Sequence, residues 1–298
     1  MHSFGWSEQK GCAVKKLLRF YLLDLRKGLV SQWKRILICA VLITFLLVLN
    51  VGYIDFYISN TPEAADSFRL TFGDLSLSLF AGIDFYYPGS GVPFVLPVEW
   101  MFLILLVLYI TLDYPLSDLY SVGVNSLIAG SSRSMWWLAK CLWVITSVMV
   151  FYCIILLLVL FITLVSSGIL SFQIHSEVPQ ALAFNVGNLK EAPWDVMTFF
   201  IVVPVFLCSL ASLQLFMSLL IRPVPSFVCM AIVLFLSTYC STDFLAGEYL
   251  MAARSSVFIV DGFSPGIGIV FAVLLGLWSV LFGILFFSQQ DILGKEKT

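Results

Sequence analysis

Residues 111–140 read TLDYPLSDLYSVGVNSLIAGSSRSMWWLAK, and this polar stretch lies between two long apolar runs. The runs cover residues 96–113 and 141–167, close to or above the ~20 apolar residues that cross a bilayer as a helix. A polar connection between two such runs belongs outside the hydrocarbon. The stretch therefore predicts a membrane protein with an extramembrane segment at 114–140.

The composition of the whole chain agrees with this interpretation. Of its 298 residues, 60% are hydrophobic and 11% are charged, and the mean hydropathy is +1.01. Ordinary soluble domains have roughly 45–50% apolar and about 25% charged residues. A soluble fold could not bury so much apolar surface, so we expect an all-α polytopic membrane protein. The net charge of -2 gives no indication of a nucleic-acid partner.

Six apolar segments are long enough, or nearly so, to cross a bilayer. They cover residues 36–54, 96–113, 141–167, 196–221, 224–242 and 265–287. We therefore divide the chain into an N-terminal segment, 1–35, and a six-span domain, 36–298. Between the spans we expect short interfacial helices within 60–95, a polar loop at 168–195 and a pair of short re-entrant helices within 243–264.

The first 35 residues are the most basic part of the chain, and their apolar residues recur at helical spacing. This pattern is typical of an amphipathic helix that lies in the cytoplasmic interface, where basic side chains meet anionic headgroups. We call this expected element the elbow helix. The alternative is a solvated basic tail.

The distribution of Lys and Arg predicts the orientation, because cytoplasmic loops carry an excess of these residues. With both termini in the cytoplasm, 13 of the 16 lie inside and three outside. The inner set is Lys10, Lys15, Lys16, Arg19, Arg26, Lys27, Lys34, Arg35, Arg133, Lys140, Arg222, Lys295 and Lys297, and the outer set is Arg69, Lys190 and Arg254. We therefore expect a multi-pass plasma-membrane protein with both termini cytoplasmic.

The sequence contains none of the usual motifs of enzymes. It has no phosphate-binding loop, no paired-histidine zinc motif and no nucleophile elbow, and its cysteines show no metal or redox spacing. We expect neither of its two histidines, His2 and His175, to have a paired acidic or cysteine ligand. The chain is therefore expected to have no catalytic residues, no metal and no cofactor of its own.

The interiors of the spans carry almost no titratable residue, whereas ion-coupled transporters need such groups along their pathway. Asn50 and Gln214 are the largest polar side chains deep in the spans. They either line a transport pathway or form hydrogen bonds between helices, and both interpretations stay open.

The segment 114–140 is the candidate docking site for a partner protein. After Tyr114 and Pro115, Ser117 or Asp118 can cap a short helix. Its apolar residues Leu119 and Val122 share a face, although the charge rule places them in the cytoplasm. Exposed apolar clusters of this kind often mark interfaces. A loop that only connects two spans is the alternative.

The C-terminal part of this segment contains Arg133 and then Trp136 and Trp137. We expect the two tryptophans to lie in an aromatic belt that anchors the next span at the membrane interface.

The order of these elements resembles the permease subunits of type-2 ABC exporters, which have an elbow helix, six spans, a coupling helix between spans two and three and re-entrant helices before the sixth. The stretch DYPLSDL at 113–119, followed by Ser132-Arg133 and by WWLAK at 136–140, is similar to a Gram-positive group of these permeases. That group tends to read Y-P-x-x-D-L and then R-S-G-S-R-x-x-W-W-L-x-K. Here Ala129 stands where the group has its first arginine.

The resemblance implies that two permeases, identical or paired with a sister chain, form the pathway, and that two ATPase subunits dock on the coupling helices. ATP and Mg²⁺ then bind the ATPases and not this chain. The implied docking residues are Tyr114, Pro115, Asp118, Leu119, Val122 and Arg133, and the implied cargo is a peptide, drug or other amphipathic molecule. A non-transporting sensor or scaffold subunit of an ATPase-containing complex is the alternative function.

Overall fold

The structure is a computed structural model. It describes residues 15–61, 68–89, 91, 93–118, 133–182, 184, 186–194 and 196–289.

Within these ranges the chain is all-helical and has no strands. The α-helices are α2 (Val30–Ser59), α3 (Phe72–Phe80), α4 (Val98–Thr111), α5 (Tyr114–Asp118), α7 (Arg133–Val165), α8 (Glu177–Ala181), α9 (Val196–Ile221), α10 (Pro223–Tyr239) and α11 (Pro265–Gln289). A π-helical turn, η1 (Leu25–Leu29), and three 3-10 turns, η3 (Val186–Asn188), η4 (Glu248–Leu250) and η5 (Ala252–Arg254), complete the set.

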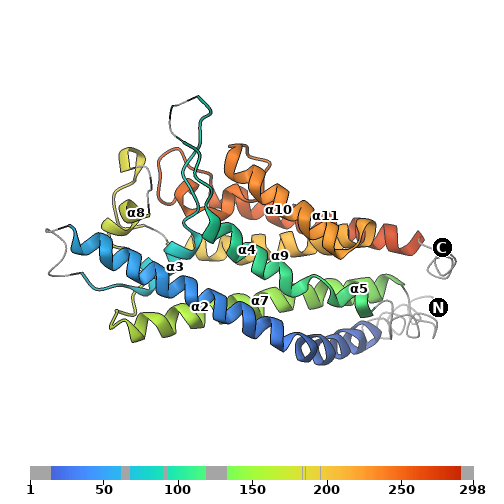
Figure 1. Ribbon diagram of the computed structural model, residues 1–298. Coiled ribbons are helices and arrows are strands. Elements are labelled where there is room, and N and C mark those ends of the chain that lie inside the picture. The colour runs from blue at the N-terminus through green and yellow to red at the C-terminus, as the bar shows by residue number, and fades with distance from the viewer. Residues whose placement is uncertain are drawn as a thin grey trace, which may run out of the picture.

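The long helices form an elongated bundle (Figure 1). Helix α9 lies at its centre and packs against α7, α10, α11 and α4. The start of the helical segment at residue 15, the short helix α5 and the end of α11 lie together at one end, which we call the α5 end (Figure 1). Helix α8 and the connection from α3 to α4 lie toward the opposite end, which we call the α8 end.

Four of the described helices, α2, α7, α9 and α11, are long and apolar enough to cross a membrane. The chain therefore has the architecture of a helical membrane protein. Helices α4, with 14 residues, and α10, with 17, lie at two of the other expected spans but are shorter. Helix α4 begins directly after Pro97, and α10 begins at Pro223, where the rigid proline ring suits the first turn of a helix.

The expected elbow helix is not a separate element in the structure. Residues 15–24 are helical and continue through η1 into α2 without a break. The π-helical turn is the only irregularity among the described residues 15–59. Lys15, Lys16, Arg19, Arg26 and Lys27 are exposed along this helical segment, so its basic face points away from the bundle.

The segments between the spans are more buried than the sequence predicted. Helix α3 begins with a capping box formed by Thr71 and Asp74, and residues 73–80 are all buried, so α3 is a core element and not an interfacial one. The predicted polar loop at 168–195 contains α8 and η3, and α8 packs on α2. Where two re-entrant helices were expected, the chain forms the buried 3-10 turns η4 and η5.

Candidate functional site

The short helix α5 places two side chains on one face. Tyr114 and Asp118 are four residues apart, which brings them to the same side of a helix. The helix is closed by the Ser117 backbone N–H, which donates to the Asp113 carbonyl oxygen at 2.9 Å. The spacing of the Y-P-x-x-D motif therefore directs a phenol and a carboxylate toward one neighbour, the side chain of Lys140 on α7.

Lys140 is fully buried, with an exposed fraction of 0%. Its ammonium group lies 2.5 Å from Oδ1 of Asp24 and 2.6 Å from Oδ2 of Asp118. Asp24 belongs to the N-terminal helical segment, Asp118 to α5 and Lys140 to α7. One cation thus joins three separate segments at the α5 end. We call Lys140, Asp24, Asp118 and Tyr114 the Lys140 cluster.

Aromatic rings enclose the ammonium group. Its Nζ lies 4.9 Å from the ring centroid of Tyr114 and 5.1 Å from that of Trp136. The Tyr114 hydroxyl also donates to Oδ1 of Asp24 at 3.1 Å, and its ring packs on Trp143 with centroids 4.4 Å apart. A buried cation is stable only when hydrogen bonds and opposite charges replace water, and this cluster supplies both.

The electrostatics of the Lys140 cluster are not fully balanced, because two carboxylates share one ammonium group. Burial raises the pKa of Asp24 above its ordinary value, and the Asp118 carboxylate adds to the rise, while Lys140 acts in the opposite direction. Burial, together with both carboxylates, also raises the pKa of the Tyr114 phenol, which therefore stays neutral. The cluster consequently has a higher proton affinity than an exposed aspartate.

A second ion pair holds the start of α5. The Arg35 guanidinium donates to Oδ2 of Asp113 at 2.6 Å, and it lies over the Tyr109 ring at 5.1 Å. Asp113, Tyr114 and Asp118 thus attach residues 113–118 to the N-terminal helical segment, to α2 and to α7. In consequence, α5 is fixed to the long helices by side chains as well as by its chain connection to α4.

The first turn of α7 is attached to α11. Arg133 donates to the carbonyl oxygen of Ser288 at 3.2 Å, and Trp136 stacks on Phe287 with ring centroids 5.0 Å apart. The Trp137 indole N–H donates to the carbonyl oxygen of Val280 at 3.0 Å. Both tryptophans are buried. They therefore pack between helices of this chain, and the aromatic belt stays a prediction.

The predicted docking residues are thus distributed between the interior and the segment that follows α5. Tyr114 and Pro115 are buried, and Asp118 contacts Lys140, so these side chains hold α5 in place. Leu119 and Val122 lie outside the described residues.

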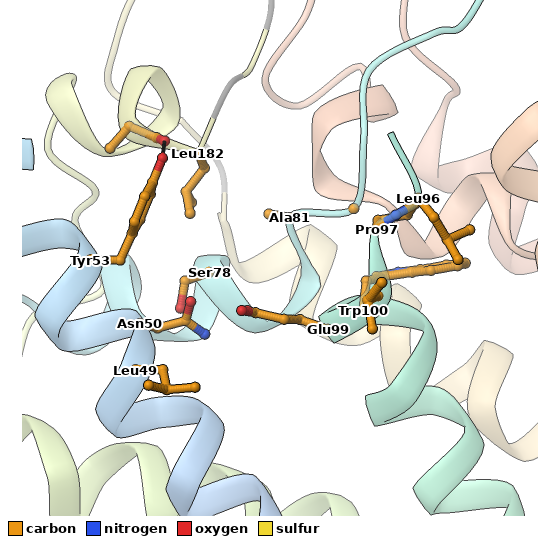
Figure 2. A pocket seen from close by; sticks show the side chains of 13 residues that line it. Leu49, Asn50, Tyr53, Ser78, Ala81, Leu96, Pro97, Glu99, Trp100 and Leu182 are labelled. Carbon is orange, nitrogen blue, oxygen red and sulfur yellow. Dashed lines mark hydrogen bonds between the residues drawn. The ribbon is translucent and has the colours of Figure 1, made fainter. Parts of the chain in front are cut away.

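The two polar residues deep in the predicted spans have different surroundings. The Gln214 amide on α9 donates to the Leu108 carbonyl oxygen on α4 at 3.2 Å, so it joins two helices. Asn50 on α2 lines a cavity of ≈ 570 Å³ near the α8 end, together with Glu99 and Ser78 (Figure 2). The Gln214 side chain thus forms a hydrogen bond between helices, which is one of the two roles expected from the sequence. The Asn50 side chain instead lines a cavity.

Two contacts between charged or polar side chains were not predicted from the sequence: Asp24 with Lys140, and His175 with Asp74. Asp24 lies in the basic N-terminal segment, yet on a helix it shares one face with Gly28 and Gln32, and all three are buried. His175 was expected to lack an acidic partner, but its Nδ1 lies 2.7 Å from Oδ2 of Asp74. The two residues of this pair are 101 positions apart, so no local pattern indicates their contact.

Among the described residues, no group of three or more His, Cys, Asp or Glu side chains could hold a metal ion. Comparison with known proteins finds no matching family model, no matching curated protein and no matching solved structure.

Proposed function

We propose that this chain is the permease subunit of an ATP-driven exporter of the type-2 ABC class, and that a separate ATPase docks on residues 114–140. The proposal also covers the finer membrane topology. Helices α4 and α10 complete six spans, residues 15–29 lie at the cytoplasmic interface, and both termini are cytoplasmic in the plasma membrane. Two permeases, identical or of two related kinds, assemble with two ATPases.

The observation that carries the proposal is the Lys140 cluster. A coupling element must transmit a movement of its partner to the spans, which requires a stiff connection between the docking segment and the long helices. Lys140 connects α5 to α7 and to the helix that leads into α2 at distances of 2.5–2.6 Å. A loop that merely joins two spans has no need for a fully buried cation with two carboxylate partners.

The mechanism follows from these attachments. When the ATPases close on ATP, the force on residues 114–140 passes through Asp118 to Lys140 on α7, and through Tyr114 to Asp24 on the N-terminal segment. Arg133 and Trp136 carry the same movement to α11. Three of the four long apolar helices are thus attached directly to the docking segment, so they would tilt together and alternate the access of the pathway.

The docking face is expected on Leu119 and Val122, whose spacing of three residues would bring them to one face of a helix. Replacing both with aspartate should remove contacts of the size of an interface hot spot, about 2–4 kcal/mol. The variant is expected to insert and purify like the wild type but to lose its ATPase partner on co-purification, and with it cargo-stimulated ATP hydrolysis.

A matched control uses Phe244 and Val260, two exposed apolar residues near the opposite end of the bundle. Their double replacement with aspartate should leave the ATPase association unchanged. Full association and full transport by the Leu119→Asp, Val122→Asp variant would show that the loop is only a connector. Association with an ATPase whose activity no cargo changes would favour a non-transporting sensor or scaffold.

A further inference from the structure

A cavity of ≈ 570 Å³ lies toward the α8 end of the bundle, between α2, α3, α4 and α8. This volume is within the roughly 300–1,000 Å³ of small-molecule sites. Its lining is mostly apolar and includes Leu49, Leu96, Pro97, Val98 and Trp100. An apolar molecule of drug or tripeptide size therefore fits the space, provided that its polar groups match those of the cavity.

Three polar side chains of the cavity, those of Glu99, Asn50 and Ser78, face one another. In Figure 2 the Glu99 carboxylate on α4 points across the opening toward Asn50 on α2 and Ser78 on α3. Asn50 has an exposed fraction of only 5%, and its Nδ2 has no hydrogen-bond partner among the described residues. A buried amide donor without a partner costs stability, so it is suited to a ligand atom that accepts a hydrogen bond.

The remaining polar atoms accept hydrogen bonds. The Tyr53 hydroxyl donates to the Ala181 carbonyl oxygen at 3.0 Å, and the Ser78 hydroxyl donates to the Leu75 carbonyl oxygen at 2.9 Å. Each hydroxyl has thereby used its single proton and keeps oxygen lone pairs for a donor. Glu99 is the only acidic residue among the described residues of the lining, and none of these residues is Lys, Arg or His.

This arrangement favours a ligand that carries a positively charged group with a hydrogen-bond acceptor next to it. Glu99 and the Ser78 hydroxyl oxygen suit an ammonium group, which is a hydrogen-bond donor only, and the Asn50 N–H suits a carbonyl oxygen close to that ammonium. The N-terminus of a peptide carries both groups on adjacent atoms. The apolar lining then accommodates its first side chains.

We propose that this cavity binds the free N-terminus of an apolar peptide, with Glu99 at the ammonium group and Asn50 at the first carbonyl oxygen. The identification of this peptide as an exported cargo rests on the proposed function, whereas the binding itself does not. A phospholipid headgroup also offers an ammonium group, but its phosphate would find no basic side chain in the described lining. The site thus favours a peptide over a lipid.

The test is equilibrium binding to the purified full-length chain in dodecyl maltoside, without ATP or an ATPase, so that its result does not depend on the proposed function. The probes are trileucine amide and its N-acetyl form, which have the same apolar body and differ in the ammonium group. Empty micelles provide the blank for both. A charge-assisted contact predicts that the free amine binds about 10- to 100-fold more tightly.

Two variants separate the two contacts. Glu99→Gln should lower the affinity for trileucine amide to that of the acetylated peptide and leave the acetylated peptide unchanged. Asn50→Leu should weaken both peptides, because both keep the first carbonyl group. Asp261→Asn, which removes an exposed carboxylate that does not line the cavity, is the matched control and should change neither affinity.

Equal binding of the two peptides, or binding of neither, would overturn the proposal. So would displacement of trileucine amide by phosphatidylethanolamine added to the micelles at equal concentration, because the site would then be a lipid site. Selective binding of the free amine that survives Glu99→Gln would remove the assigned role of Glu99 and with it the proposal. If binding is selective but no ATPase associates with the chain, the cavity proposal stands and the proposed function fails.

Discussion

Two fully buried cations lie at opposite ends of the bundle, and they are held in different ways. Lys140, at the α5 end, binds the carboxylates of Asp24 and Asp118. Arg254, in η5, lies where the end of α10 meets the chain that leaves α3. Each has an exposed fraction of 0%, so each has lost its hydration and needs replacement partners within the protein.

Arg254 binds mainly to backbone. Its guanidinium donates to the carbonyl oxygens of Ile83 at 2.9 Å, Asp84 at 3.1 Å, Ser237 at 2.8 Å and Thr238 at 2.9 Å, and to Oε2 of Glu248 at 2.5 Å. Ser237 and Thr238 are in the last turn of α10, whose terminal carbonyl groups have no partner within the helix. Arg254 thus caps α10 and fixes the α3–α4 connection against it.

The two sites therefore differ in how they respond to a change of pH and to a movement of α5. Four of the five acceptors of Arg254 are carbonyl groups, which do not titrate, and the planar fork of arginine matches several of them at once, so most contacts of this site do not depend on pH. The partners of Lys140 are two carboxylates on different segments, one of which has a raised pKa because it is buried. The stability of the Lys140 cluster therefore depends on the protonation of Asp24 and on the position of α5.

The largest effect on stability is expected at Arg254. Arg254→Met leaves four carbonyl groups and a buried carboxylate without their donor, so the free energy of unfolding should fall by about 3–5 kcal/mol. The measurement is denaturant or thermal unfolding of the purified chain in detergent. Arg254→Lys should recover part of the loss, since an ammonium group cannot reach all five acceptors.

The matched control at this end is Glu248→Gln. Burial raises the pKa of Glu248 to about 7, with Arg254 acting in the opposite direction. A glutamine oxygen can still accept from Arg254, but the buried guanidinium loses its carboxylate partner, so a cost of about 1–3 kcal/mol is expected, below that of Arg254→Met. If Arg254→Met lowered the free energy of unfolding no more than this control, the contact between α10 and the α3–α4 connection would not depend on Arg254.

A smaller loss is expected at Lys140. Lys140→Met should lower the free energy of unfolding by about 2–3 kcal/mol, because the buried Asp24 carboxylate, whose pKa is already raised, can take up a proton. The triple variant Asp24→Asn, Lys140→Met, Asp118→Asn removes all three charges and should return to within about 1 kcal/mol of the wild type. An equal loss in the single and triple variants would mean that the charges themselves are not what holds α5.

The smallest effect is expected at His175, whose side chain is 35% exposed. The hydrogen bond to Asp74 raises the pKa of His175 above its ordinary value of 6.5, with burial acting in the opposite direction. A raised histidine pKa stabilises the fold below pH 6.5 and loses this contribution as the pH rises through the folded-state pKa. After solvent screening the change should stay below about 1 kcal/mol.

The check is the unfolding midpoint of the wild type and of His175→Gln over this pH range. Glutamine keeps a donor for Asp74 but does not titrate, so the decline in stability at rising pH should disappear. The same decline in both proteins would assign it to other groups.

Particular residues show where the sequence analysis was sufficient. The apolar runs at 36–54, 141–167, 196–221 and 265–287 each coincide with a helix long enough to cross a membrane, because continuous apolar composition is a local property. The Y-P-x-x-D spacing places Tyr114 and Asp118 on one face of α5, while their role in docking stays a prediction. The packing of Trp136 and Trp137 against α11 was not predicted, since a hydropathy pattern does not distinguish lipid from a neighbouring helix.

The sequence by itself determined that the chain is a helical membrane protein, where its long helices lie and that its charges gather at their ends. These features depend on the length, period and composition of contiguous segments. Only the tertiary structure decided which charges meet. Asp24 and Lys140 are 116 positions apart, and Asp74 and His175 are 101 apart. The desolvation that makes such pairs form depends on burial by the whole bundle, which no local stretch of sequence encodes.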